Sequence, residues 1–439
     1  MSSYVNSIIR THRNLLAIVV LAAVLRLIWV LYAQTVPGSD FAQYDLLAQR
    51  LAEGKGYVDE FGEPTAFYAI GWPFFLSVIY RIFGHSLIAA GLINALMGVG
   101  AVILVYTISR YLLDYRAVLI ATLLVAINPT LILYSSTHGT ESLFVFEILL
   151  LTWLIMRALT GQHTIELILI GILTGFAILT RPVGISVPLG AVVAVYALNR
   201  HDFRRNLSKI LLIVVVSAVI VTPWIVRNAV TVGATTLQTS GGVTLWIGNN
   251  PQATGGLMPP PAVPGLTAGA RPGAGPDATE AEANSAYTSA AIDSFLADPV
   301  RAVTLIPRKM FELWAGHRHA VTHSTRKSGR VIPGFILGSL PILTQAYLIS
   351  LLALVLVAFG MKHSRKIWVV GPGITLTATF VFWNAFHMMS FGSGRYHVPL
   401  EPFLAMFAAS ALSAMLLAYK ARASGDHGSG NESSSLKPG

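Results

Sequence analysis

Long apolar runs, separated by short polar stretches, dominate the chain. A helix of about 20 apolar residues crosses the hydrocarbon core of a bilayer, and lipid offers the backbone no outside hydrogen-bond partner, so each run is expected to be helical. Several runs are short, and neighbouring helices or local thinning of the bilayer must cover their ends. Ten runs are predicted to span: residues 15–33, 87–108, 117–134, 139–156, 165–179, 183–198, 210–226, 342–359, 367–382 and 398–417.

Residues 67–83 are also apolar, but Gly71 and Pro73 interrupt them. If this stretch spanned, every later loop would change side, and the distribution of positive charge decides between the two topologies. If residues 67–83 do not span, the short loops on one side hold only Arg181 and Arg395. Those on the other side hold Arg110, Arg116, Arg157, Arg200, Arg204, Arg205, Lys209, Lys362, Arg365 and Lys366. Cytoplasmic loops carry the excess of Lys and Arg. We therefore expect 67–83 to lie in or dip into the outer interface of the cytoplasmic (inner) membrane, with both termini cytoplasmic.

Two long segments then fall outside. The first, 34–86, carries six of the twenty acidic residues and contains a predicted surface helix at 40–53, whose apolar positions repeat at helical spacing. The second, 228–341, is predicted to open with a turn-rich run at 240–251, to continue with a mobile Pro/Gly/Ala stretch at 255–276, and to form helices at 278–296 and 299–314.

This topology divides the chain into four parts. An N-terminal transmembrane module, 1–227, includes the first outer loop, and an extracytoplasmic segment covers 228–341. C-terminal transmembrane helices follow at 342–420, and a Ser/Gly-rich cytoplasmic tail at 421–439 is predicted to be disordered.

Composition agrees with a membrane protein. The chain is 54% hydrophobic and only 11% charged, where soluble domains carry about 25% charged residues. The net charge of +10 does not indicate nucleic-acid binding, because the cations sit between spans, as orientation signals do. There is no cysteine, so neither a disulfide nor a thiol is available. The first run, 15–33, is long and leads into an acidic loop, which favours an uncleaved span over a removable signal peptide.

Carboxylates on the outer side are candidates for chemistry, because ionisable groups at membrane depth are costly. Asp40 follows the first span and could take a proton from an acceptor hydroxyl; alternatively, Ser39 or Asp40 simply caps the next helix. Glu141 begins the fourth span and could position an acceptor or tune Asp40; alternatively, it only favours the helix dipole. Asp45 belongs to the same outer set.

Three arginines share this side: Arg181, Arg227 and Arg395. A guanidinium can hold a phosphate through two parallel hydrogen bonds. The alternative for each is that it reaches toward lipid headgroups. Carboxylates and arginines on one side of the membrane suit a reaction that needs a base and an anion clamp.

Two further features have weaker meaning. His317, His319 and His323 could form a metal set, but their segment is basic and has no carboxylate after Glu312, so no metal is expected. Arg26 lies inside the first span and receives no role.

Several strings resemble bacterial GT-C glycosyltransferases, in particular the branch that includes protein O-mannosyltransferases and the lipid A aminoarabinose transferase. The likeness extends over about 15–417. It is carried by Ser39-Asp40-Phe41-Ala42-Gln43-Tyr44, Pro64-Thr65-Ala66-Phe67, Gly71-Trp72-Pro73-Phe74, Pro223-Trp224 with Arg227-Asn228, Leu245-Trp246-Ile247-Gly248-Asn249-Asn250-Pro251, and Arg395-Tyr396 with Pro399-Leu400-Glu401-Pro402.

The resemblance implies a GT-C bundle with interfacial helices in the first outer loop and a mixed outer segment before the eighth span. It also implies a polyprenyl-phosphate sugar donor, no other cofactor, inverting transfer to a glycan, lipid or protein acceptor, and Asp40 as the catalytic base. Glu141, from its position, is the second expected catalytic residue. Arginines can stabilise the departing phosphate without a metal. The expected substrate-binding residues are Tyr44, Tyr68, Arg181, Arg227, Asn249, Arg395 and Tyr396.

One departure from the family concerns the donor phosphate. Relatives often carry a basic residue and a Pro-Pro pair before the position of Gly71, where this chain has Tyr68, Ala69 and Ile70. Another arginine is therefore expected to hold the phosphate here.

Two other functions remain open. A transporter of an anionic or lipid-linked substrate would also use arginines and carboxylates inside a bundle, although the sequence shows no matching halves with paired broken helices. A ligase or polymerase of cell-surface polysaccharide would share the chemistry but use a different donor.

Overall fold

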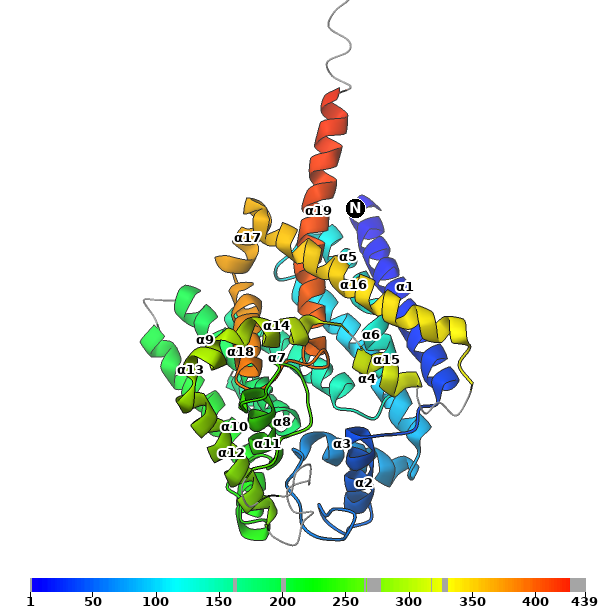
Figure 1. The fold of residues 1–439 in the computed structure, drawn as a ribbon. Coiled ribbons are helices and arrows are strands. Elements are labelled where there is room, and N and C mark those ends of the chain that lie inside the picture. The colour runs from blue at the N-terminus through cyan, green and yellow to red at the C-terminus, as the bar shows by residue number, and fades with distance from the viewer. Residues whose placement is uncertain are drawn as a thin grey trace, which may run out of the picture.

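The computed structural model describes residues 2–160, 164–198, 203–263, 266, 278–316, 318–325 and 331–426. Within these ranges every regular element is a helix, joined by turns and two isolated β-bridges. Figure 1 shows the N-terminus and the far end of the last helix at one end of the bundle, and the helices of the first loop at the other. Both termini of the described chain therefore lie on the same side, which the predicted topology requires.

Six described helices are long and apolar enough to cross a membrane, and a bent pair makes a seventh span if counted as one. The six are α1 (Ser2–Ala33), α4 (Leu87–Ser109), α7 (Glu141–Thr160), α10 (Phe203–Thr231), α16 (Gly334–Gly360) and α19 (Glu401–Asp426). The bent pair is α17 (Lys362–Val369) and α18 (Ile374–Met388), which meet at 75°. The chain is a multi-pass membrane protein.

Shorter helices complete the bundle and the outer layer. The apolar ones are α3 (Gly71–Phe83), α5 (Tyr115–Ala126), α8 (Thr164–Thr180), η1 (Pro182–Ile185) and α9 (Ser186–Leu198). The others are α2 (Asp40–Ala52), α6 (Pro129–Tyr134), α11 (Ser240–Asn249), α12 (Glu280–Ala297), α13 (Pro299–Thr304), α14 (Ile306–Trp314), α15 (Arg318–Thr325) and η3 (Val398–Leu400). Each of the ten predicted spans thus has a helix, although four of them are shorter than a full crossing or divided.

The core lies around α7 and α19, in each of which 61% of the spanning residues are buried. By contrast, only 6% of α10 is buried, so this helix lies at the periphery and turns its side chains toward lipid. A central α7 matters for function, because its first residue is Glu141.

Three predicted boundaries were wrong. The predicted span 117–134 is divided into α5 and α6, because Asn128 caps a new helix by accepting from Leu131 N at 3.1 Å and Pro129 begins it. The predicted helix 299–314 is likewise divided, since Pro307 lies in the first turn of α14 and lacks the N–H that a continuous helix would use. The last helix runs to Asp426, past the predicted start of the tail, and residues 427–439 lie outside the described chain.

The predicted turn-rich run 240–251 was also wrong, because most of it forms the helix α11. Its glycines serve packing instead of turning. A Cβ on Gly242 would lie 2.2 Å from Asn284 O, so the small residue lets α11 approach α12 closely. The predicted mobile stretch 255–276 lies mostly outside the described residues.

Candidate active site

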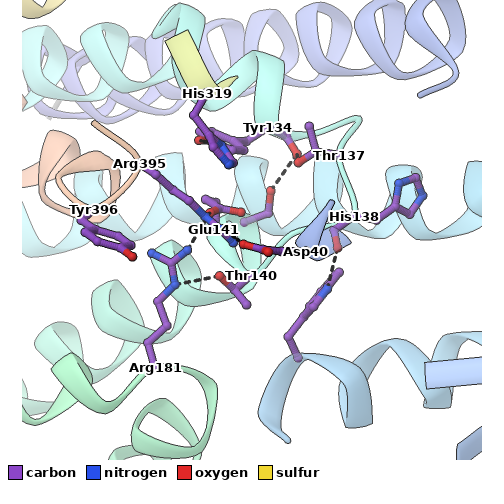
Figure 2. Close-up of polar contacts among 12 residues, drawn as sticks. Asp40, Tyr134, Thr137, His138, Thr140, Glu141, Arg181, His319, Arg395 and Tyr396 are labelled. Carbon is purple, nitrogen blue, oxygen red and sulfur yellow. Dashed lines mark hydrogen bonds and ion pairs between the residues drawn. The ribbon is translucent and has the colours of Figure 1, made fainter. Parts of the chain in front are cut away.

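Four charged side chains from distant parts of the chain meet in one cluster (Figure 2). Glu141 Oε1 accepts a hydrogen bond from Arg181 Nη2 at 2.6 Å and another from Arg395 Nε. Arg395 Nη1 also donates to Asp40 Oδ2 at 3.1 Å. Arg395 therefore joins both carboxylates.

Glu141 is the buried centre of this cluster. Its side chain is 1% exposed, and it begins α7, where a carboxylate interacts favourably with the helix dipole. Two guanidinium groups compensate the burial of the charge, as a buried carboxylate requires. Glu141 is thus placed to orient both arginines and has little surface for a substrate.

Arg181 is held at the end of α8 by the residue that follows it. Pro182 disfavours helical geometry at the preceding position, and Arg181 is extended (φ −150°, ψ 125°). Its Nε donates to Thr140 Oγ1 at 2.7 Å, and its guanidinium carbon lies 5.6 Å from the ring centre of Phe144. The two bonds, to Thr140 and Glu141, fix the plane of the guanidinium.

Arg395 lies in the loop between α18 and η3, and its side chain is 8% exposed. The loop is tightly packed, since a Cβ on Gly394 would lie 1.8 Å from Gly316 O. Burial disfavours the charge, but the carboxylate of Glu141 outweighs it and raises the pKa of Arg395 well above its ordinary value. Arg395 is therefore a fixed cation of the site.

Asp40 is the accessible carboxylate of the cluster, with 43% of its side chain exposed. It begins α2, and Ser39 before it has a φ of 55°, a left-handed conformation that non-glycine residues rarely adopt. Ser39 makes no side-chain capping bond to the helix. Besides Arg395, Asp40 is bound by Tyr68, whose hydroxyl donates to Oδ1 at 3.1 Å.

Aromatic rings surround Asp40. The rings of Tyr44 and Tyr68 meet edge to face at 4.9 Å, and Phe41 lies under the guanidinium of Arg395 at 5.0 Å. Burial raises the pKa of Tyr44 to about 12, so its hydroxyl stays neutral. Burial also raises the pKa of Tyr396, which Figure 2 places beside Arg395.

Two predicted substrate-binding residues lie outside the cluster. Arg227 donates to Thr65 O at 2.6 Å and to Tyr57 O at 2.8 Å, which ties the end of α10 to the first loop. Asn249 donates to Met389 O at 2.8 Å and accepts from Lys309 Nζ at 3.0 Å. Both side chains connect segments of the outer layer.

Two histidines from the outer segment lie over the site. His319 Nδ1 is 3.2 Å from the hydroxyl of Tyr134, and the ring of His319 stacks on His323 at 4.1 Å. Burial, with repulsion from Arg395, lowers the pKa of His319 to about 2, so the imidazole is neutral. His317 lies outside the described residues, and within the described ranges no three His, Cys, Asp or Glu side chains could hold a metal ion.

The sequence did not indicate that Tyr134, Thr140 or Phe41 would be part of the site. Thr140 directly precedes Glu141, and this position could have indicated that it lies in the site. Phe41 and Tyr134 looked like ordinary apolar positions of helices. Asp45 forms a separate cluster, in which it accepts from Tyr80 and contacts His85 at 3.0 Å.

The helical bundle is similar in fold to a solved membrane glycosyltransferase, the architecture that the sequence motifs predicted. Archaeal oligosaccharyltransferase AglB from Archaeoglobus fulgidus, solved with an inhibitory peptide and a dolichol-phosphate, aligns with a TM-score of 0.52 at 16% identity, covering 96% of this chain and 52% of that chain. ArnT from Cupriavidus metallidurans, solved with undecaprenyl phosphate, aligns with a TM-score of 0.44 at 16% identity, covering 90% of this chain and 76% of that chain.

Sequence comparison points the same way. Residues 68–226 match the family described as dolichyl-phosphate-mannose-protein mannosyltransferase. YkcB of Bacillus subtilis (strain 168), provisionally named a mannosyltransferase, is 29% identical over 155 residues, which are 35% of this chain and 21% of that protein. The chain thus spans about half the length of AglB and a fifth of YkcB.

Proposed function

We propose that this protein transfers a sugar from a polyprenyl-phosphate donor to an acceptor on the outer side of the membrane, with inversion at the sugar carbon and Asp40 as general base. The observation that supports this best is the unequal exposure of the two carboxylates. Asp40 is 43% exposed and Glu141 1% exposed, within one cluster of two arginines. Only Asp40 has a surface that an acceptor could reach.

The proposed step is a single displacement. The acceptor hydroxyl oxygen forms a bond to the anomeric carbon while the bond from that carbon to the phosphate oxygen breaks, and the electron pair stays on the phosphate. The acceptor proton passes to Asp40, which must lie within hydrogen-bond reach of it. Tyr68 donates to Oδ1 and Arg395 to Oδ2, and the exposed part of the carboxylate is left for the acceptor.

Arg181 and Arg395 are the proposed phosphate-binding residues. Fixed cations stabilise charge that develops on a leaving group, and they cost no reorganisation if they are already oriented. Glu141 supplies this orientation through Oε1, so we assign it as a positioning residue. Relatives often carry a basic residue before the position of Gly71, and this chain does not. Arg181 and Arg395 are therefore the candidates to bind the donor phosphate in its place.

The donor class rests on the family match and on the dolichol-phosphate bound to AglB. Neither the transporter nor the polysaccharide ligase is favoured by these comparisons. We further propose that the protein lies in the inner membrane with both termini in the cytoplasm, because this topology leaves the arginine-rich short loops inside and the site outside.

The test is transfer from radiolabelled polyprenyl-monophosphate sugars and, in parallel, polyprenyl-diphosphate sugars in membranes that contain wild type, Asp40→Asn or Asp293→Asn at matched abundance. Asp293 is exposed on α12 and serves as the control carboxylate. We expect transfer by wild type and Asp293→Asn, and its loss with Asp40→Asn. Equal transfer by Asp40→Asn would remove Asp40 as the base. Transfer from a diphosphate donor alone would favour the ligase instead.

A further inference from the structure

An exposed apolar surface runs along three consecutive helices of the outer segment, α12 to α14. Its members are large hydrophobic side chains on the outward faces of these helices, which we call the apolar ridge: Leu296 (68% exposed), Val300 (72%), Val303 (60%) and Phe311 (69%), with Phe295 and Ile306 beside them. Large apolar side chains exposed on neighbouring helices suit a surface that binds a partner or a membrane.

The contacts of α14 place this helix, which carries one end of the ridge, alongside a helix of the bent span. Lys309 Nζ donates to Met388 O at 3.1 Å, at the end of α18, which is part of the bent span. Trp314 reaches farther along that helix: its Nε1 donates to Asn384 Oδ1 at 3.0 Å, and its ring stacks on Phe380 at 5.5 Å. Phe380 lies eight residues before Met388, which is about 12 Å along a helix.

The two faces of α14 differ as they do in a helix at a membrane surface. Lys309 and Leu313 are buried against the protein, and Phe311 points outward. Arg308 is exposed on the same helix. A cation beside an outward apolar face is typical of a helix that inserts its apolar side chains below the headgroups and keeps the charge at the phosphate level.

We infer that the apolar ridge inserts into the leaflet on the side of the candidate site, with acyl chains as its partner and Arg308 at the headgroup phosphates. A second copy of the chain or a soluble protein is not favoured, because α14 packs on a helix of the membrane-spanning pair from Met388 to Phe380. The inference does not depend on the proposed sugar transfer.

Insertion of the ridge would also set the height of the candidate site. Leu313 O lies 2.5 Å from Nδ1 of His397, two residues after Arg395, so α14 contacts the loop that carries this arginine. A lipid-anchored helix thus holds Arg395 at the boundary where the phosphate of a lipid-linked molecule would lie.

Because the chain has no cysteine, single cysteines can be introduced without other changes. We would label Val303→Cys and Phe311→Cys with a nitroxide in nanodiscs of phosphatidylcholine and phosphatidylglycerol, and measure accessibility to oxygen and to a water-soluble nickel chelate by power saturation. Val219→Cys on the lipid-facing side of α10 (64% exposed) and Phe61→Cys in the first outer loop (76% exposed) are the matched controls.

Insertion predicts that both ridge labels behave like the label at 219, with collisions with the nickel chelate reduced roughly tenfold relative to the label at 61. Accessibility to the chelate equal to that at 61 would show a water-facing surface and overturn the inference. Low accessibility to both reagents would show a protein contact and overturn it as well. Two ridge positions are used so that the result stands if one variant fails to fold.

Discussion

The candidate site contains two carboxylates, and replacing each by its neutral amide should affect stability and sugar transfer differently. Glu141→Gln removes a carboxylate that contacts both buried arginines, and its amide oxygen can accept from one guanidinium without balancing the charge. Asp40→Asn changes a carboxylate that is 43% exposed, where water already solvates much of the group. The two variants each remove one negative charge that contacts Arg395.

The expected magnitudes follow from burial. Removing one partner of a buried ion pair costs about 3–5 kcal/mol, because the other charge is left uncompensated. Glu141, Arg395 and Arg181 expose 1%, 8% and 13% of their side chains, so this range applies to Glu141→Gln. For Asp40→Asn the exposed pair predicts a loss below about 1 kcal/mol.

The assay is thermal unfolding in detergent together with sugar transfer, for wild type and both variants at equal protein. We expect Glu141→Gln to lower the Tm by several degrees and Asp40→Asn to leave it within a degree or so, while transfer is lost in both. Asp293→Asn is the control for a charge change on the surface. The reasoning is refuted if Glu141→Gln has the same Tm as Asp40→Asn, since the buried arginines would then not need the charge of Glu141 for stability.

Three further outcomes test the structure around the site. Gly394→Ala should displace Arg395 and reduce transfer at least tenfold, because the new Cβ would lie 1.8 Å from a backbone oxygen; Gly338→Ala, which meets nothing within 4 Å, is the control to assay beside it. Arg227→Met should lower the Tm by removing two bonds to the first loop while leaving the KM for the donor unchanged; a raised KM with an unchanged Tm would contradict this structural role. His319 has a pKa of about 2 in the fold and 6.5 unfolded, so the unfolded state alone gains its proton as the pH falls below 6.5. Wild type should therefore lose about 1–2 kcal/mol more stability than His319→Gln between pH 7 and 5 in paired thermal melts, and equal losses would count against a buried neutral imidazole.

Much of the fold could be predicted because its causes are local. An apolar run partitions into lipid wherever the rest of the chain goes, and each predicted span has a helix in the structure. The surface helix predicted at 40–53 is present as α2, since its apolar spacing already determines one buried face. The breaks at Asn128 and before Pro307 were missed because hydropathy is averaged over a window, and a cap or a missing N–H acts at one residue.

The candidate site was predicted only in part. Asp40, Glu141, Arg181 and Arg395 were all expected on one side, but Arg181 and Arg227 looked equivalent in the sequence. The structure gives Arg181 a buried carboxylate and gives Arg227 two backbone carbonyls. Which partner a guanidinium meets depends on where the other helices pack, and no local pattern contains that information.

The sequence by itself determined that the protein is a helical membrane protein with charged groups collected on one side, because hydropathy and charge are properties of short segments. Only the tertiary structure decided that Arg395 meets Glu141, 254 positions away, and that Asp40 remains open beside them. The physical reason is that α7 is buried at the centre of the bundle while α2 lies at its edge. Burial therefore makes one carboxylate an anchor for two cations and leaves the other accessible to a substrate.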